Sequence, residues 1–397
     1  MKIALIDNMN NNMFALTRYF RTLGINADLF LIPNSSHQHF APEQDSWADL
    51  EGVSWIKEFP LSYNWKNYLM PVKHLLRNEF SAYDKVIACG PSLGLLHRAG
   101  IRVDLFIPYG SDLYNLPFFS KQVCSSKPFK LAFVFFLILY RCYVQKKGIR
   151  NAKCTISNAN WKVAQQAVDR IGCSSVNLPR IMICKETLPA KAFNEFDFFK
   201  KHDFVVFSPT RHLWKTNDEP LSDFDRFGGA KRNDKLVVAF ARAVHEKLFD
   251  NPLLALCEYG ADVGHTKELV RELGVESSVH WFPIMPRREL VAGISMATFV
   301  ADQFREGMSA TSAGTTNESL AYGTPVITNT DGAILSEDDP YFECPILEAI
   351  TVDEIYGYFK DYARNPVKYS ETGKRSEKWF DENLGEGLAE KYLGLLQ

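Results

Sequence analysis

The sequence predicts an α/β protein built from two doubly wound parallel sheets. Short apolar strands alternate along the chain with amphipathic helices, which is the pattern of consecutive β-α-β units. At 397 residues the chain is too long for one typical hydrophobic core, so two domains of about 150–200 residues are expected. The alternation lapses around 179–199. We therefore predict an amino-terminal domain of residues 1–200, onto which a carboxyl-terminal helix 375–397 packs back, and a second domain of residues 201–374.

The composition is that of an ordinary soluble protein, with 46% hydrophobic and 23% charged residues. A net charge of −2 argues against nucleic acid as a partner. The eight cysteines form no C-x-x-C pair, and several sit in apolar runs as reduced core thiols do. Met1 leads straight into an apolar strand, without a secretory signal. These features predict a cytoplasmic protein.

In the first domain the apolar runs predict strands and the amphipathic runs predict helices. The expected strands are 2–6, 27–32, 85–89, 103–108 and 153–156, and the expected helices are 13–23, 65–78, 91–99 and 160–170. The first β-α-β unit lacks a G-x-G-x-x-G fingerprint, which argues against a dinucleotide there. Instead Asn8 and Asn10–Asn12 follow the first strand, and asparagine tolerates left-handed backbone. This loop either faces a ligand or is a plain surface turn. The aromatic, irregular residues 34–65 are expected to form an insertion on the acceptor side.

The segment Tyr109-Gly-Ser-Asp112 follows the strand expected at 103–108. Ligands of open α/β sheets bind at the carboxyl ends of the strands, so this segment is a candidate site. The alternative is a turn in which Asp112 caps the next element.

A basic, acid-free segment follows. From Leu113 to Val168 there is no Asp or Glu among 56 residues, but there are nine Lys or Arg residues. Within it, the apolar run Leu131–Tyr140 reaches half of the about 20 residues that a spanning helix needs. A Phe-rich helix with basic flanks is typical of a segment that dips into an anionic membrane surface. We predict such contact for residues 121–153, and the alternative is a buried core helix with solvated lysines.

The second domain contains the most informative stretch of the chain, residues 314–327. Its expected strands are 204–207, 253–258, 279–282, 298–300 and 325–328, and its expected helices are 234–248, 266–273, 286–295 and 352–365. Residues 314–327 read Gly-Thr-Thr-Asn-Glu-Ser-Leu-Ala-Tyr-Gly-Thr-Pro-Val-Ile, a small-residue loop that runs into a short helix and a strand. Free N–H groups at such a helix start suit a phosphate, whereas Glu318 is better placed to accept hydrogen bonds from a ribose diol. Together they predict half of a nucleotide-sugar site.

Residues 317–327 resemble the EAMA-x-G-x-PVI segment of the glycosyl transferases group 1 family, which includes bacterial lipopolysaccharide and capsule enzymes. Ser208-Pro-Thr-Arg211 and Ala230-Lys231-Arg-Asn-Asp234 look like the R…KG-x-D pair of that family, with Arg232 as a rival to Lys231. The resemblance covers about residues 204–350. It implies the GT-B fold, in which two Rossmann-like doubly wound domains face a central cleft.

The resemblance also implies roles in binding a UDP- or GDP-linked sugar. Arg211 and Lys231 would clamp the diphosphate and stabilise the charge that develops as the nucleotide leaves. Backbone N–H groups at the helix start would bind the same diphosphate, Glu318 would hold the ribose hydroxyls, and the turn after strand 279–282 would meet the base. The helix start comprises Gly314, Thr315 and Thr316, and the turn comprises Pro283 and Ile284.

The sequence departs from the family pattern at two positions. Tyr109 stands where the family has histidine in an HG(T/S)D segment, and Tyr109 and Asp112 are the candidates for polarising the acceptor hydroxyl. Ala310 stands where the family has an acid eight residues before the glutamate. Glu306 and Asp302 are the nearby acids, and either could contact the donor sugar.

The resemblance therefore implies a retaining transferase of hexosyl or N-acetylhexosaminyl groups from a UDP- or GDP-sugar to a lipid-linked or saccharide acceptor of surface polysaccharide synthesis. We expect it at the inner face of the cell membrane, and without a metal cofactor, because cationic side chains and the helix start would neutralise the diphosphate. One alternative is a nucleotide-sugar 2-epimerase of the same architecture. Another is an inactive sugar-nucleotide-binding scaffold subunit, which the residues at positions 109 and 310 keep open.

Overall fold

The computed structural model describes residues 1–33, 41–118, 128–157, 162–215, 230–305, 314–330, 337, 339 and 341–397, with the backbone alone at 128–132 and 162. The chain divides into two compact units. The first comprises Met1–Glu43, Ala48–Cys184 and Leu384–Gln397, and the second comprises Gln44–Trp47 and Lys185–Asn383. The structure thus places the change of unit at 184/185, not at 200/201. It also assigns 375–383 to the second unit and the short segment 44–47 to it as well.

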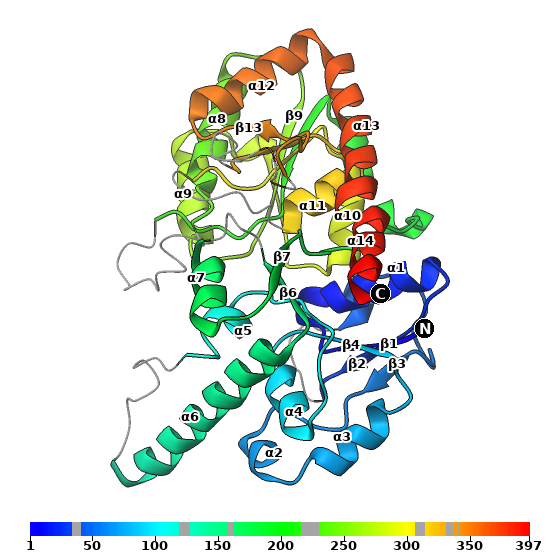
Figure 1. Ribbon diagram of the computed structural model, residues 1–397. Helices are drawn as coiled ribbons and strands as arrows, with labels where there is room; N and C mark the ends of the chain where they lie inside the picture. The colour runs from blue at the N-terminus through cyan, green and yellow to red at the C-terminus, as the bar shows by residue number, and fades with distance from the viewer. Residues whose placement is uncertain are drawn as a thin grey trace. The chain divides into compact units, whose positions relative to one another are not determined.

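The first unit is organised around a seven-stranded parallel sheet with the order β3-β2-β1-β4-β5-β6-β7 (Figure 1). Its strands are β1 Lys2–Ile6, β2 Asn26–Leu31, β3 Ile56–Glu58, β4 Lys85–Ala88, β5 Leu105–Phe106, β6 Cys154–Ser157 and β7 Ser175–Asn177. Its helices are α1 Asn12–Thr22, α2 Trp65–Leu69, α3 Lys73–Phe80, α4 Ser92–Ala99, α5 Ser111–Tyr114, α6 Pro128–Asn151, α7 Lys162–Ile171 and α14 Glu386–Leu396, with short 3₁₀ helices η1 Met9–Asn11 and η3 Pro42–Gln44.

The helix expected at 65–78 is two helices, α2 and α3. Met70 leaves the helical region at φ −74° and ψ 157° because Pro71 follows it, and the residue before a proline is pushed into extended backbone. The asparagine loop does adopt left-handed backbone, with φ of 53° at Asn10 and 58° at Asn11. Asn11 is buried, so the loop is not an exposed surface turn.

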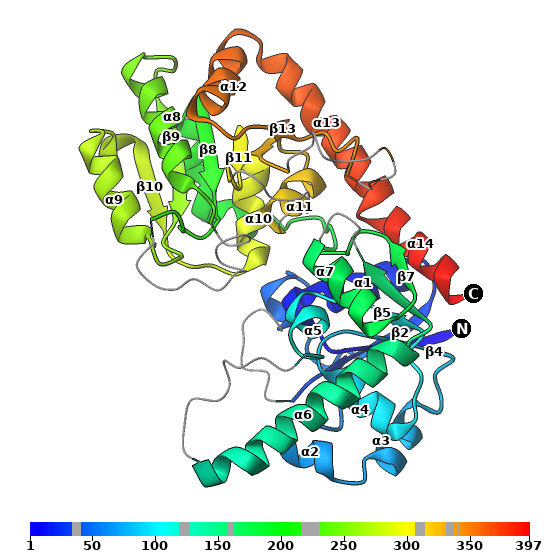
Figure 2. The same cartoon turned by 60° about the vertical axis from the view of Figure 1, so that its left-hand side comes forward.

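The Phe-rich run lies in α6, a helix of 24 residues. Its carboxyl-terminal part packs against α4 and buries Val144 and Ile149 in the core of the first unit. Its amino-terminal turns extend beyond α4 in both views (Figures 1 and 2). Within the described part of the chain, no helix has both the length and the apolarity to cross a bilayer.

The second unit holds a six-stranded parallel sheet with the order β10-β9-β8-β11-β12-β13. Its strands are β8 Phe204–Ser208, β9 Pro252–Cys257, β10 Val279–Phe282, β11 Phe299–Ala301, β12 Val326–Thr328 and β13 Leu347–Glu348. Its helices are α8 Asn233–His245, α9 Val263–Glu272, α10 Arg287–Met296, α11 Gly314–Ala321, α12 Val352–Arg364 and α13 Pro366–Asn383, with 3₁₀ helices η5 Ala190–Lys201 and η7 Glu276–Ser278. Both sheets therefore have the doubly wound order that the alternation predicts.

The carboxyl-terminal tail is two helices rather than one. In α13, a Cβ on Gly373 would lie 2.1 Å from the carbonyl oxygen of Gly323, so only glycine allows this helix to approach the Gly-Thr-Pro turn before β12. The helix ends before Leu384, and α14 belongs to the first unit, where Tyr392 donates its hydroxyl to the carbonyl of Pro179.

Candidate functional site

The candidate site of the second unit lies where the strand order reverses. The chain runs from β8 outward to β9 and β10, then returns to β11 on the other side of β8. Ligands of doubly wound sheets bind at the carboxyl ends of strands at such a switch point. Arg211 follows β8, and Asp302 follows β11 directly. The hydroxyl of Thr210 donates to the carbonyl oxygen of Asp302 at 3.4 Å, which joins the two strand ends.

Asp302 organises the polar side chains at this switch point. Its Oδ1 lies 3.0 Å from Nζ of Lys231, which also donates to Oε1 of Gln303 at 3.0 Å. Its Oδ2 accepts a hydrogen bond of 2.7 Å from the hydroxyl of Thr316, in the first turn of α11. The Asp302 side chain is fully buried and that of Lys231 nearly so. Two segments predicted from sequence, 230–234 and 314–318, thus meet on one buried carboxylate.

The backbone before α8 selects Lys231 over its neighbour Arg232. The N–H of Lys231 donates to the carbonyl of Leu213 at 2.7 Å, and the Lys231 carbonyl accepts from the N–H of Phe304 at 3.0 Å. Arg232 adopts left-handed backbone at φ 56°, and its guanidinium pairs with Asp234 at 2.8 and 2.9 Å. Lys231 is therefore the one that reaches the carboxylate at the end of β11.

Glu318 is held by an arginine that the sequence analysis did not single out. Nε of Arg287, at the start of α10, lies 2.8 Å from Oε1 of Glu318, and its Nη1 lies 2.8 Å from Oδ1 of Asp45. Burial raises the pKa of Glu318 above its ordinary value, while the Arg287 guanidinium acts in the opposite direction. Oε1 of Glu318, the residue expected to accept from the ribose, is thus already paired with the Arg287 guanidinium.

The remaining donor-side residues are placed as follows. Gly314 and Thr315 form the partly buried start of α11, and Arg211 is also partly buried. Pro283 and Ile284 are exposed directly after β10. Glu306 and Ala310 lie outside the described residues, so the choice between Glu306 and Asp302 as the sugar contact stays open.

A further cation at this site, Arg305, was also not singled out from the sequence. It comes three residues after Asp302 and is nine-tenths buried. Its Nε and Nη1 are buried without a hydrogen-bond partner among the described residues. Burial lowers the pKa of its guanidinium and so does Arg211, while Asp302 acts in the opposite direction. Its only local signal in the sequence is its place shortly after Asp302, which the sequence analysis named as a candidate sugar contact.

In the first unit, Asp112 binds backbone groups with both carboxylate oxygens. Its Oδ1 accepts from the N–H of Gly110 at 2.9 Å and of Tyr109 at 3.0 Å, and its Oδ2 accepts from the N–H of Gly90 at 2.9 Å. Asp112 is buried, and these backbone N–H groups occupy most of the acceptor capacity of its carboxylate. Burial raises the pKa of the Tyr109 phenol well above its ordinary value, so at neutral pH this group keeps its proton and can donate a hydrogen bond.

A second carboxylate, Asp7, lies at the switch point of the first sheet, directly after β1. It has left-handed backbone at φ 73°, and its Oδ2 accepts a hydrogen bond from the hydroxyl of Tyr63. A Cβ on Gly90 would lie 2.2 Å from the same oxygen, so the loop after β4 needs glycine here. Burial raises the pKa of Asp7 to about 6, and nearby Asp112 adds to the effect.

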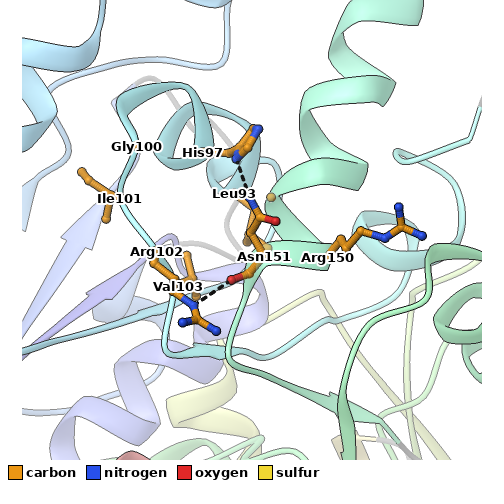
Figure 3. Close-up of a pocket in the computed structure, with 9 residues that line it drawn as sticks. Leu93, His97, Gly100, Ile101, Arg102, Val103, Arg150 and Asn151 are labelled. Atoms are coloured by element: carbon orange, nitrogen blue, oxygen red, sulfur yellow. Dashed lines mark hydrogen bonds between the residues drawn. The ribbon is translucent and has the colours of Figure 1, made fainter.

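A pocket of the first unit lies away from these strand ends (Figure 3). Its lining includes Arg102 and Val103, before β5, and Asn151, before β6, so it sits at the amino ends of strands. Its polar groups bond to one another: Nε of Arg102 donates to the Asn151 carbonyl at 3.1 Å, and the Asn151 amide lies 3.2 Å from Nδ1 of His97. We assign it no ligand.

The structure is similar over nearly its whole length to solved structures of other proteins. Anabaena HepE in complex with UDP matches with a TM-score of 0.58 at 13% identity, over 99% of this chain and 98% of that chain. Sucrose-phosphate synthase from Thermosynechococcus elongatus matches with a TM-score of 0.54 at 14% identity, over 100% of this chain and 98% of that chain. WaaG, a glycosyltransferase involved in lipopolysaccharide biosynthesis, matches with a TM-score of 0.52 at 13% identity, over 100% of this chain and 99% of that chain. The sequence itself matches no protein-family model and no curated protein.

At these identities the similarity shows the fold alone. The chain has the GT-B fold of two Rossmann-like units, which confirms the predicted fold class.

Proposed function

We propose that the chain is a glycosyltransferase that moves a sugar from a UDP- or GDP-linked donor to a lipid-linked or saccharide acceptor of surface polysaccharide synthesis, with retention of configuration. The observation that carries the proposal is the cluster around Asp302, in which Lys231 and the first turn of α11 meet at the switch point of the second sheet. The fold supports it, because one structural neighbour is described as bound to UDP and another as a glycosyltransferase of lipopolysaccharide biosynthesis.

In this proposal the donor diphosphate binds to Lys231, Arg211 and the N–H groups of Gly314–Thr316. Asp302 and Gln303 hold the Lys231 ammonium in place before the donor arrives, so little side-chain entropy is lost on binding. The fixed cations and the helix start stabilise the charge on the leaving diphosphate, without a metal ion. The second oxygen of Glu318 accepts from the ribose, and Pro283 and Ile284 contact the base.

For the acceptor we propose that the loop 109–112 contributes through its donors. The Tyr109 phenol donates a hydrogen bond, and Asp112 orients the loop by binding its backbone N–H groups. This makes Asp112 a positioning residue in the structure as observed, because its carboxylate binds the backbone of this loop on both oxygens.

We further propose that α6 contacts the anionic inner face of the cell membrane. Residues 133–136 are four consecutive exposed positions, and a helix turn exposed on every side is not a core helix. Phe133 is 54% exposed and Phe136 58% exposed, and Trp65 of α2 packs edge-on against Phe133 with ring centroids 6.1 Å apart. Exposed Lys66 lies next to Trp65.

Several exposed apolar side chains continue this surface over α2 and α3. They are Leu69, Met70 and Leu75. Apolar side chains beside lysines match a surface that offers acyl chains below anionic head groups. An acceptor carried on a lipid would then reach the enzyme at the membrane.

The test is incubation of the protein with radiolabelled UDP- and GDP-sugars and a membrane lipid extract. Label that enters the lipid phase supports the transferase. Conversion of the free nucleotide sugar without transfer would replace the proposal with the 2-epimerase. Binding across the donor panel without turnover would replace the proposal with the inactive scaffold subunit. The matched control is the Lys231→Gln variant, which should transfer no label.

A further inference from the structure

Arg305 is a buried cation with two guanidinium nitrogens that have no hydrogen-bond partner in the part of the chain that the structure describes. Its side chain follows β11 in the loop that carries Asp302, and nine-tenths of the residue is removed from solvent. Neither Nε nor Nη1 has a hydrogen-bond partner among the described residues. A buried guanidinium without partners is costly, so its presence calls for an explanation.

The backbone around Arg305 is held firmly. Its carbonyl oxygen accepts a hydrogen bond from the side-chain amide of Asn329, and the preceding N–H, of Phe304, donates to the Lys231 carbonyl. The Asn329 N–H in turn donates to the carbonyl of Gln303 at 2.8 Å. The guanidinium is therefore presented by a fixed loop.

Among the described residues, Asp302 is the acid that acts on Arg305. It already binds Lys231 through Oδ1 and Thr316 through Oδ2. Arg211 is close enough to repel the Arg305 guanidinium. Within the described part of the chain, Lys231 and Arg305 thus share one buried carboxylate at the strand ends, and Arg211 is a further cation nearby.

We propose that Arg305 binds the diphosphate of the donor with its unpartnered Nε and Nη1, as a third cation beside Arg211 and Lys231. The inference rests on the proposed function and adds a residue to its site. Nε and Nη1 lie on different edges of the planar guanidinium, so each would donate to a different oxygen of the diphosphate. An ammonium at this position would not present such a fixed fork of donors. The first turn of α11, which reaches Asp302 through Thr316, supplies further N–H donors to the same anion.

The experiment measures melting temperature and affinity for wild type, Arg305→Gln and Arg305→Lys, each with inorganic pyrophosphate, UDP or uridine. We expect pyrophosphate and UDP to raise the melting temperature of wild type. In Arg305→Gln both affinities should fall about tenfold or more, the loss of one charge-assisted contact. Uridine affinity should stay unchanged. Arg305→Lys, which keeps a positive charge, should recover part of the lost affinity. If Arg305→Gln does not fold, the lysine variant still allows the affinities to be compared with wild type.

Arg288→Gln is the matched control. Arg288 also has a buried Nε without a partner among the described residues, but its guanidinium lies over the ring of Trp47, 5.0 Å from the centroid. Its removal should leave pyrophosphate affinity unchanged. Without ligand, Arg305→Gln should melt at or above the wild-type temperature, because a buried unpartnered charge is removed.

The outcomes separate this inference from the proposed function. A wild type that transfers no sugar, but whose pyrophosphate affinity falls in Arg305→Gln as expected, would keep the inference and overturn the transferase. Pyrophosphate and UDP affinities that are equal in wild type and Arg305→Gln would overturn the inference and leave the transferase standing. A lower melting temperature of ligand-free Arg305→Gln, with unchanged pyrophosphate affinity, would show that the guanidinium is structural and would also overturn it.

Discussion

Arg287 donates to Glu318 across 2.8 Å, so the expected ribose acceptor is one end of an ion-paired chain that continues to Asp45. Asp45 and Arg287 are 242 positions apart in the sequence. The two carboxylates that Arg287 binds, those of Asp45 and Glu318, are both buried. A carboxylate whose Oε1 is held in this way has its orientation set before a nucleotide arrives. It can offer Oε2 to a hydroxyl without first losing side-chain freedom.

The Glu318→Ala variant tests this arrangement. If Glu318 accepts hydrogen bonds from the ribose, UDP affinity should fall by about 1–3 kcal/mol, or about 5- to 150-fold. Calorimetry compares the affinity for UDP with that for 2′,3′-dideoxy-UDP, which lacks the ribose hydroxyls. Wild type should bind UDP more tightly, and the variant should bind both nucleotides equally. Glu258→Ala, which removes an exposed carboxylate paired with Lys267, is the control. Equal loss of affinity for both nucleotides would contradict the ribose assignment.

Lys231→Gln and Arg232→Gln form a matched pair of adjacent substitutions. Lys231 faces the Asp302 carboxylate, whereas Arg232 pairs with Asp234 and is more exposed. Removing the Lys231 charge should weaken UDP binding by about 1.5–3 kcal/mol, the usual value of a hydrogen bond to a charged group. The Arg232 change should have no effect within error. Titration calorimetry with UDP and with uridine locates the loss at the phosphates, and a larger effect of Arg232→Gln would reverse the assignment.

Asp7 should make the stability of the protein depend on pH. Its pKa is about 6 in the folded chain against 3.8 in the unfolded chain, because burial disfavours the charged form. Between these values the folded state holds a proton that the unfolded state has released, so stability falls as pH rises through this window. The full effect is about 3 kcal/mol, absent below pH 4 and complete above pH 6.

Urea unfolding of wild type and Asp7→Asn between pH 3.5 and 7 measures this effect, with pH values chosen to span the window. Other titrating groups cancel in the difference, apart from those that contact Asp7 or act on it. These are Tyr63, Tyr68, Cys89 and Asp112. The stability of the variant relative to wild type should increase with pH, by an amount approaching the calculated value. A difference that stays constant over the range would show that the Asp7 pKa is close to its ordinary value.

Phe136→Asp tests the apolar surface of α6. The Phe136 side chain is 58% exposed, so the change should not disturb the core, but it places a charge where acyl chains would lie. Losing one inserted phenylalanine costs about 1.5–3 kcal/mol, so binding should weaken at least about tenfold. Flotation with vesicles containing anionic lipid, at low and high salt, measures it. Val367→Asp, at a 65% exposed position of α13 in the second unit, is the control. Indifference of wild type to anionic lipid and salt would contradict the membrane proposal.

The strands that the sequence analysis missed share one position in the fold. β3 and β7 are the edges of the first sheet, and β13 is an edge of the second. The central strands are covered on both faces and therefore appear in the sequence as continuous apolar runs. Edge strands are only partly covered, and all three lack fully buried positions. Apolar periodicity consequently locates the central strands and the edge strand β10, which buries Phe282, but not these three edge strands.

The candidate site divides in the same way between local and distant contributions. The helix start at 314–316 and the Lys231 segment have recognisable local patterns, and the structure brings them together on Asp302. Arg287 has no local signature, because its role depends on Asp45 and Glu318, which come from distant parts of the chain. Arg305 is distinguished only by burial, which is a property of the folded chain.

The sequence by itself determined the doubly wound architecture, because hydrophobic burial imposes a period on every central strand and helix. It also indicated a helix that begins with small residues at Gly314, and the structure has α11 there. Only the tertiary structure decided which polar groups meet: that Lys231 and Thr316 share Asp302, and that Arg287 holds Glu318. It also decided that Nε and Nη1 of Arg305 have no hydrogen-bond partner among the described residues. The physical reason is that ion pairing acts between groups that are close in space. The two partners can lie anywhere along the chain, so no sequence pattern links them.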